Sequence, residues 1–140
     1  MTPRLKRIGR LIELRGRAAD AARVALAQAV AATTLRRAEE RAAEAAWEAA
    51  MDAEHPRSVG DLEDTHDAIQ ALRHMLERAR DEVRAAEISE TAHRHHVQEA
   101  EKDRKKLEVW RDAMHETLTA DAARLERRAT DETAARIRKT

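Results

Sequence analysis

Apolar and small side chains recur at alternating intervals of three and four along the second half of the chain. The series is Leu62, Thr65, Ile69, Leu72, Leu76, Ala79, Val83, Ala86, Val97, Ala100 and Leu107. It spans more than six heptads, and neither proline nor glycine occurs after Gly60. Such a sustained heptad pattern is typical of a coiled coil. The pattern therefore predicts one long helix over residues 61–138.

A similar spacing covers the start of the chain and predicts a first helix over residues 3–53. Its apolar positions are Leu5, Ile8, Ile12, Ala19, Ala22, Leu26 and Ala29. Pro3 is tolerated in a first helical turn, and Thr2 is a candidate cap. Gly9 and Gly16 should each weaken the helix by about 1 kcal/mol relative to Ala. From Ala38 onward the helix is rich in Ala, Glu and Arg, and Trp47 is its one large apolar residue.

Residues 54–60, EHPRSVG, form the only expected break between the helices. Pro56 cannot continue a helix and Gly60 relaxes the backbone. Either Ser58 with Asp61 or Asp61 with Asp64 offers a cap for the second helix. So short a connection places the helices antiparallel. With the turn centred near residue 57, residue i of the first helix should lie opposite residue 114 − i.

This register predicts which residues of the two helices are neighbours, and it predicts an overhang. Leu5 and Ile8 should lie beside Leu107 and Trp110, and Trp47 should lie near residues 67–69. The second helix should extend past the first from about Ala113. The fold prediction is thus all-α: a two-helix antiparallel coiled-coil hairpin with an overhanging C-terminal helix, forming a single domain over residues 1–140.

The overhang carries its own apolar stripe. Its members are Trp110, Met114, Leu118, Ala122, Leu125 and Ala129. An isolated amphipathic helix gains most of its stability by packing its apolar face. The stripe therefore indicates either a frayed or self-associating end or a surface for another protein.

Composition excludes several classes of protein. The 140 residues include two Trp and no Phe or Tyr, and 39% are charged, which is too little bulky apolar material for a globular core of that size. There is no Cys, so disulfide and thiolate chemistry are excluded. No apolar run approaches twenty residues, and no apolar segment follows the basic start. We expect a cytoplasmic protein without a signal peptide or membrane insertion.

Charge is balanced overall but unevenly distributed. Residues 1–37 carry a net +7, residues 39–67 a net −8 and residues 102–140 a net +3. Folding the predicted hairpin brings the first and last of these segments to one basic end and leaves the turn end acidic. A solvated coiled coil usually mixes its charges, so this polarity indicates a different partner at each end.

Nucleic acid is a weak candidate for the partner of the basic end. Two basic clusters could meet phosphates: Arg4, Lys6, Arg7 and Arg10, and Lys102, Arg104, Lys105 and Lys106. However, acidic residues are interleaved along the second helix, the isoelectric point is about 7.1, and stacking aromatic residues are missing. We therefore predict no nucleic-acid binding.

Metal and catalytic chemistry are also weak candidates. Glu63 with His66 and Glu90 with His93 match the spacing of helical di-iron ligands, and His95 and His96 lie close by. Such sites draw ligands from four helices, whereas this chain supplies two. Glu90 and His93 fit a polar layer that fixes the helix register. We predict no metal, no cofactor and no enzymatic activity.

The order of short motifs resembles the FliJ family, the stalk protein of the flagellar type III export apparatus, and more distantly its injectisome counterparts. The matching features include the Ala/Glu-rich first helix and the Pro/Gly break. The matching runs are RLKRIGRLIELR at 4–15, IQAL at 69–72, KKLEVW at 105–110 and RLERRATDETAARIR at 124–138. The similarity covers nearly the whole chain.

The resemblance implies a cytoplasmic coupling rod, peripheral to the inner membrane, in a flagellar rather than injectisome system. The end with both termini would insert into a hexameric export ATPase, and the other end would contact the membrane export gate. The family is also associated with export chaperones. The residues implied at the ATPase end are Arg4, Arg7, Arg10, Leu11, Leu14, Arg124, Arg127, Arg128 and Arg136. Those implied at the gate end are Ala68, Leu72, Met75 and Ala79, of which only Leu72 matches the family well.

The alternative interpretation is a structural scaffold. In that case two chains would associate through the C-terminal helix into a four-helix bundle that buries Met114, Leu118 and Leu125.

Overall fold

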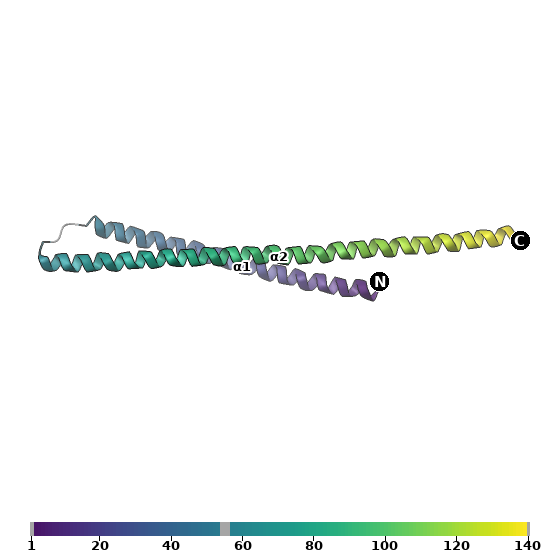
Figure 1. The fold of residues 1–140 in the computed structure, drawn as a ribbon, viewed down its shortest axis with the longest axis horizontal. Coiled ribbons are helices and arrows are strands. Elements are labelled where there is room, and N and C mark those ends of the chain that lie inside the picture. The colour runs from purple at the N-terminus through teal and green to yellow at the C-terminus, as the bar shows by residue number, and fades with distance from the viewer. Residues whose placement is uncertain (1, 54–56, 140) are drawn as a thin grey trace. The chain divides into compact units, whose positions relative to one another are not determined.

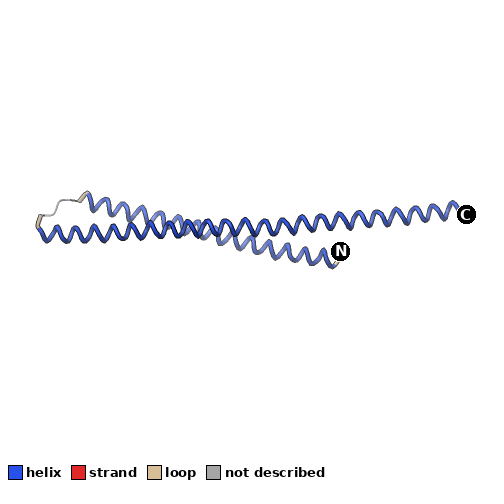
Figure 2. The backbone as a smooth tube through the Cα atoms, viewed as in Figure 1, coloured by secondary structure: helices blue, strands red, loops and turns tan. Residues whose placement is uncertain are grey.

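The computed structural model describes residues 2–53 and 57–139, and it contains two helices and no strand within those ranges (Figures 1 and 2). Helix α1 covers Pro3–Met51 and helix α2 covers Val59–Lys139. The prediction of an all-α, two-helix hairpin is confirmed. Both helices meet the turn two residues earlier in the sequence than expected, so α1 is shorter and α2 longer at this point.

The chain divides into two compact units. The terminal unit comprises Met1–Asp20 and Gln98–Thr140, and the turn unit comprises Ala21–Val97. Each unit therefore contains one stretch of α1 and one stretch of α2. That the whole chain behaves as one domain stays a prediction.

Side-chain caps explain where the helices begin. The Thr2 hydroxyl accepts a hydrogen bond from the Leu5 amide at 3.4 Å, and the Ser58 hydroxyl accepts one from the Asp61 amide at 3.1 Å. Each cap satisfies one of the amides that a first helical turn leaves unpaired. Thr2 was the predicted cap of the first helix, and Ser58 was one of the two arrangements predicted for the second. Pro56 lies outside the described residues.

The core of the turn unit follows the predicted heptad positions of α2. Leu76, Ala79 and Val83 are buried, and Thr65, Ile69, Leu72 and Ala86 are half-buried. Leu62, the first predicted member, is 56% exposed. It lies three residues after the first residue of α2, close to the turn (Figure 1).

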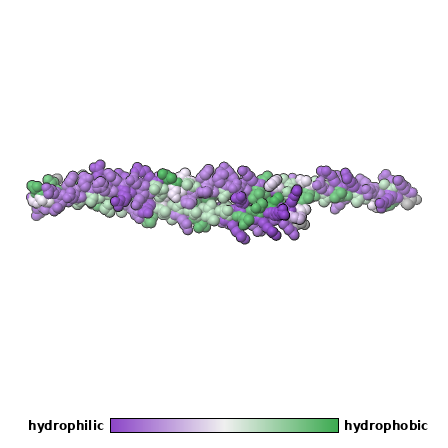
Figure 3. All heavy atoms as spheres, turned by 60° about the horizontal axis from the view of Figure 1, so that its bottom comes forward, coloured by the Kyte–Doolittle hydropathy of each residue, from purple (hydrophilic) through white to green (hydrophobic). Residues whose placement is uncertain are grey.

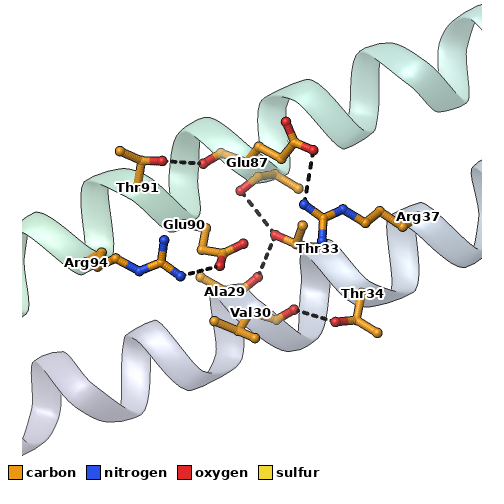
Figure 4. Close-up of polar contacts among 10 residues, drawn as sticks. Ala29, Val30, Thr33, Thr34, Arg37, Glu87, Glu90, Thr91 and Arg94 are labelled. Carbon is orange, nitrogen blue, oxygen red and sulfur yellow. Dashed lines mark hydrogen bonds and ion pairs between the residues drawn. The ribbon is translucent and has the colours of Figure 1, made fainter.

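Thr33 on α1 reaches the backbone of α2 in the turn unit. Its side chain is 1% exposed, and its hydroxyl lies 3.0 Å from the Ala29 carbonyl oxygen and 3.3 Å from that of Ala86 on α2 (Figure 4). A hydroxyl can point at another helix's backbone only where the facing side chains are small. Ala29 and Ala86 provide that space.

Ion pairs between the helices border this core. Arg36 pairs with Glu82 at 3.1 Å, Arg37 with Glu87 at 3.2 Å (Figure 4), and Glu44 with Arg80 at 4.0 Å. A hydrogen bond from Arg36 to Glu39 and the charges of Glu82 and Glu39 raise the pKa of the Arg36 guanidinium. Because that pKa already lies far above neutrality, Arg36 stays charged and its pairing is constant across physiological pH.

These pairs correct the predicted register in the turn unit. The paired residue numbers add to 119 for Thr33 with Ala86, to 118 for Arg36 with Glu82, and to 124 for Arg37 with Glu87 and for Glu44 with Arg80, rather than to 114. For the buried contact of Thr33 the difference is about one helical turn. The prediction was wrong because it centred the register on the loop, whereas the close packing at Thr33 sets it.

The terminal unit shows the same displacement. Arg15 pairs with Asp103 at 3.9 Å, so these residue numbers add to 118. Ile8 is 7% exposed and lines a groove with its predicted neighbour Trp110 and with Met114, which lies one turn further along α2. Ala19 is fully buried.

The overhang consequently begins later than predicted. Met114 and Leu118 are half-buried, and both line a groove with Thr2 and Arg4. Every described residue from 119 to 139 is exposed. Those residues form about 30 Å of helix at 1.5 Å per residue. The overhang thus starts after Leu118 rather than at Ala113.

Candidate partner-binding surfaces

The terminal unit displays basic side chains that have no ion-pair partner among the described residues. Arg4, Arg7 and Arg10 lie on the first turns of α1, are exposed, and have no ion pair with any described residue. The capped start of α1 fixes the backbone that carries them. Unpaired guanidinium groups retain their full capacity to bind carboxylates of another molecule.

The overhang adds a second group of exposed arginines. Arg124 lies 3.9 Å from Asp121, whereas Arg127, Arg128 and Arg136 have no ion pair with a described residue. The structure thus places all seven sequence-predicted arginines on the terminal unit. It leaves six of the seven unpaired within the described chain.

Exposed apolar side chains accompany these cations. Leu11 and Leu14 are 44% and 57% exposed, and Leu125 is 65% exposed. In the space-filling view of Figure 3, a strongly hydrophobic region (green) lies over the N-terminal part of α1. Apolar side chains beside unpaired cations are typical of a protein-binding surface rather than a solvated one.

A groove between α1 and α2 lies in the same unit. It has a volume of about 450 Å³ and is lined by Thr2, Arg4, Trp110, Ala113, Met114, Thr117 and Leu118. An adjoining hollow adds Arg7 and Ile8 to the same Trp110 and Met114. We call this the Trp110 groove. Trp110 is 62% exposed in it.

Sequence reasoning missed this groove because the groove depends on the register. Trp110 lies beside Ile8 as predicted, but the overhang was expected to begin at Ala113, so Met114 and Leu118 were not expected to line a groove with Thr2 and Arg4. The one available signal was Trp110 itself, since the chain contains only two aromatic residues.

The four residues predicted for the gate end lie on α2 in the turn unit but are not equally accessible. Ala68 is exposed, Met75 is 58% exposed and Leu72 is half-buried, whereas Ala79 is 9% exposed and belongs to the core. Ala68, Leu72 and Met75 are spaced by four and three residues, so they share one side of the helix. An accessible surface here therefore comprises three of the four residues.

Glu90 and His93 occupy the seam positions predicted for them. The Glu90 side chain is 15% exposed and accepts a hydrogen bond from Arg94 at 2.8 Å (Figure 4), and His93 is half-buried. Within the described ranges, no three His, Asp or Glu side chains gather as metal ligands would. Neither helix, as far as it is described, has an uncharged apolar stretch long enough to cross a bilayer.

Comparison with known proteins gives one clear match. The FliJ family, described as the flagellar FliJ protein, matches residues 5–139. Searches of curated proteins and of solved structures gave no match. The family match covers both helices, including the basic start of α1 and the overhang of α2. The chain belongs to the FliJ family of flagellar export proteins.

Proposed function

We propose that the chain is a stalk that couples the export ATPase to the export gate in the flagellar type III apparatus. Membership of the FliJ family associates the chain with the export apparatus. That family consists of structural export components rather than enzymes. The stalk is cytoplasmic and peripheral to the inner membrane. Its two partners bind different units of the chain.

The ATPase docks on the terminal unit. The observation that carries this assignment is the set of seven exposed arginines, six of them without an ion pair to a described residue, beside exposed Leu11 and Leu14. Arg4, Arg7 and Arg10 extend from α1, and the arginines of residues 124–136 extend from the overhang. Carboxylates lining the ATPase ring would pair with them. Differential contacts with subunits in different nucleotide states would favour cyclic hydrolysis.

The export gate binds the turn unit. Ala68 and Met75 widen the apolar surface of α2 beyond its core, and Leu72 lies at the border of that core. Since Ala79 is buried, it supports the packing under this surface instead of touching the gate. Export chaperones are further candidate partners, for which we assign no surface.

Co-purification with the hexameric export ATPase tests the docking. A triple variant with Arg124→Glu, Arg127→Glu and Arg128→Glu should bind the ATPase at least about tenfold more weakly, because loss of complementary charge at an interface costs several kcal/mol. A matched control reverses Arg41, Arg57 and Arg78 of the turn unit, which are exposed and form no ion pair with a residue that the structure describes. This control should bind normally. Equal binding by both variants would disprove the docking.

A scaffold remains the second candidate, favoured by the exposure of every described residue after Leu118. A scaffold would form a stable dimer that persists in high salt and dissociates with Leu118→Ala and Leu125→Ala. Light scattering at high salt separates the two proposals, since the stalk should be monomeric there.

A further inference from the structure

The start of α2 is an acidic helical segment with uncovered apolar side chains. Val59 and Leu62 are 74% and 56% exposed and lie three residues apart, on one side of the helix. Residues 59–68 contain no Lys or Arg and four acidic residues: Asp61, Glu63, Asp64 and Asp67. All four are exposed and have no ion pair with a described residue. We call residues 59–68 the acidic helix start.

The Trp110 groove has the opposite character. It is lined by the apolar side chains of Trp110, Met114 and Leu118 and by Arg4 and Arg7. Both arginines are exposed and unpaired among the described residues. A helix with two apolar anchors flanked by carboxylates matches this surface in both hydrophobicity and charge.

We propose that the acidic helix start of one copy of this chain docks in the Trp110 groove of a second copy. Val59 and Leu62 pack against Trp110 and Met114, and the flanking carboxylates pair with Arg4 and Arg7. The Ser58 cap already orders the acidic helix start, so docking requires little additional ordering. This inference does not depend on the proposed export function.

The overhang does not fit the same groove as well. Residues 119–139 carry six basic and four acidic side chains, so their net charge has the same sign as that of Arg4 and Arg7. Like charges brought together at an interface oppose binding. Charge complementarity therefore selects the acidic helix start as the occupant.

This contact joins two different surfaces, so each docked pair leaves one groove and one acidic helix start free. Such a head-to-tail contact can add further copies unless its geometry closes a ring. Two apolar anchors and a few exposed ion pairs make a small interface. The association should accordingly be weak and sensitive to salt.

Sedimentation equilibrium of the full chain tests the proposal. In about 0.05 M salt the average mass should rise with protein concentration, and in about 0.5 M salt the apparent dissociation constant should increase at least about tenfold. A monomer at every concentration in low salt would overturn the proposal. So would association of equal strength in both salts.

Two charge-reversed variants give the sharper test. The first carries Arg4→Glu and Arg7→Glu, and the second carries Glu63→Lys and Asp67→Lys, the two carboxylates nearest the Val59 and Leu62 side of α2, which leaves Asp61 in the first turn of α2. Neither variant should associate alone, whereas an equimolar mixture should, because each supplies the surface that the other lacks. Self-association of either variant alone at wild-type strength, or failure of the mixture, would contradict the proposal.

Two further variants locate the contact. Trp110→Ala should weaken association about tenfold, since buried aromatic anchors dominate small interfaces. Arg127→Glu with Arg128→Glu has the same charge change as the first variant but lies outside the groove, and should associate normally. If this control dissociates instead, the overhang forms the contact and the groove does not. Circular dichroism should show unchanged helix content in all variants.

Discussion

At the scale of single residues, Thr33 has the most specific role in the packing of the helices. It is nearly completely buried, and its hydroxyl lies near one carbonyl oxygen on each helix. A residue larger than Thr would push α2 away, and an apolar residue of the same shape would lose the polar contact. Nothing in the heptad pattern distinguishes Thr33 from other small residues, so the sequence alone could not identify it.

Replacing the Thr33 hydroxyl should reduce stability. Thr33→Val keeps the shape and removes the hydrogen bond, so we expect a loss of about 1 kcal/mol in the free energy of unfolding, measured by urea denaturation. Thr34→Val is a matched control, because the Thr34 hydroxyl is exposed and bonds only Val30 of its own helix at 3.0 Å. The control should change stability by less than about 0.5 kcal/mol. Equal effects would show that Thr33 makes no special contact.

At the scale of elements, the helices and their buried faces were largely predictable because both follow from local pattern. From Thr65 to Leu107, the α2 positions that the heptad pattern predicted to face α1 are all buried or half-buried. Glu90 and His93 continue the same seam. The register was not predictable. Sliding one helix by a turn exchanges one small residue for another, and only contacts such as Thr33 with Ala86 distinguish the two alignments.

Substitutions at two neighbouring residues of α2 should distinguish a side chain that packs in the core from one that is available to a partner. Leu76 is 3% exposed and Met75 is 58% exposed. Leu76→Ala should destabilise the protein by about 2–4 kcal/mol, because it leaves a cavity between the helices. Met75→Ala should cost less than about 0.5 kcal/mol. Thermal unfolding followed by circular dichroism measures both. Similar losses for the two variants would refute the assigned faces of α2.

At the scale of the whole molecule, the two units differ in charge and therefore in the partners that suit them. The terminal unit carries unpaired arginines, and the turn unit contains the segment of net charge −8. The charge segregation and the arginines were predictable from composition and from family resemblance. The Trp110 groove was not, because it forms only when α1 and α2 pack in the observed register.

The central claim is that separate units serve separate partners. The most direct measurement is a paired assay of each variant: stimulation of ATP hydrolysis by the hexameric export ATPase, and binding to the export gate. The variant with Arg124, Arg127 and Arg128 changed to Glu should lose most of the stimulation and still bind the gate. Met75→Lys should lose gate binding and still stimulate hydrolysis, since Met75 is exposed and its change leaves the core intact. If either variant loses both activities, or neither loses any, the assignment of the two units is contradicted.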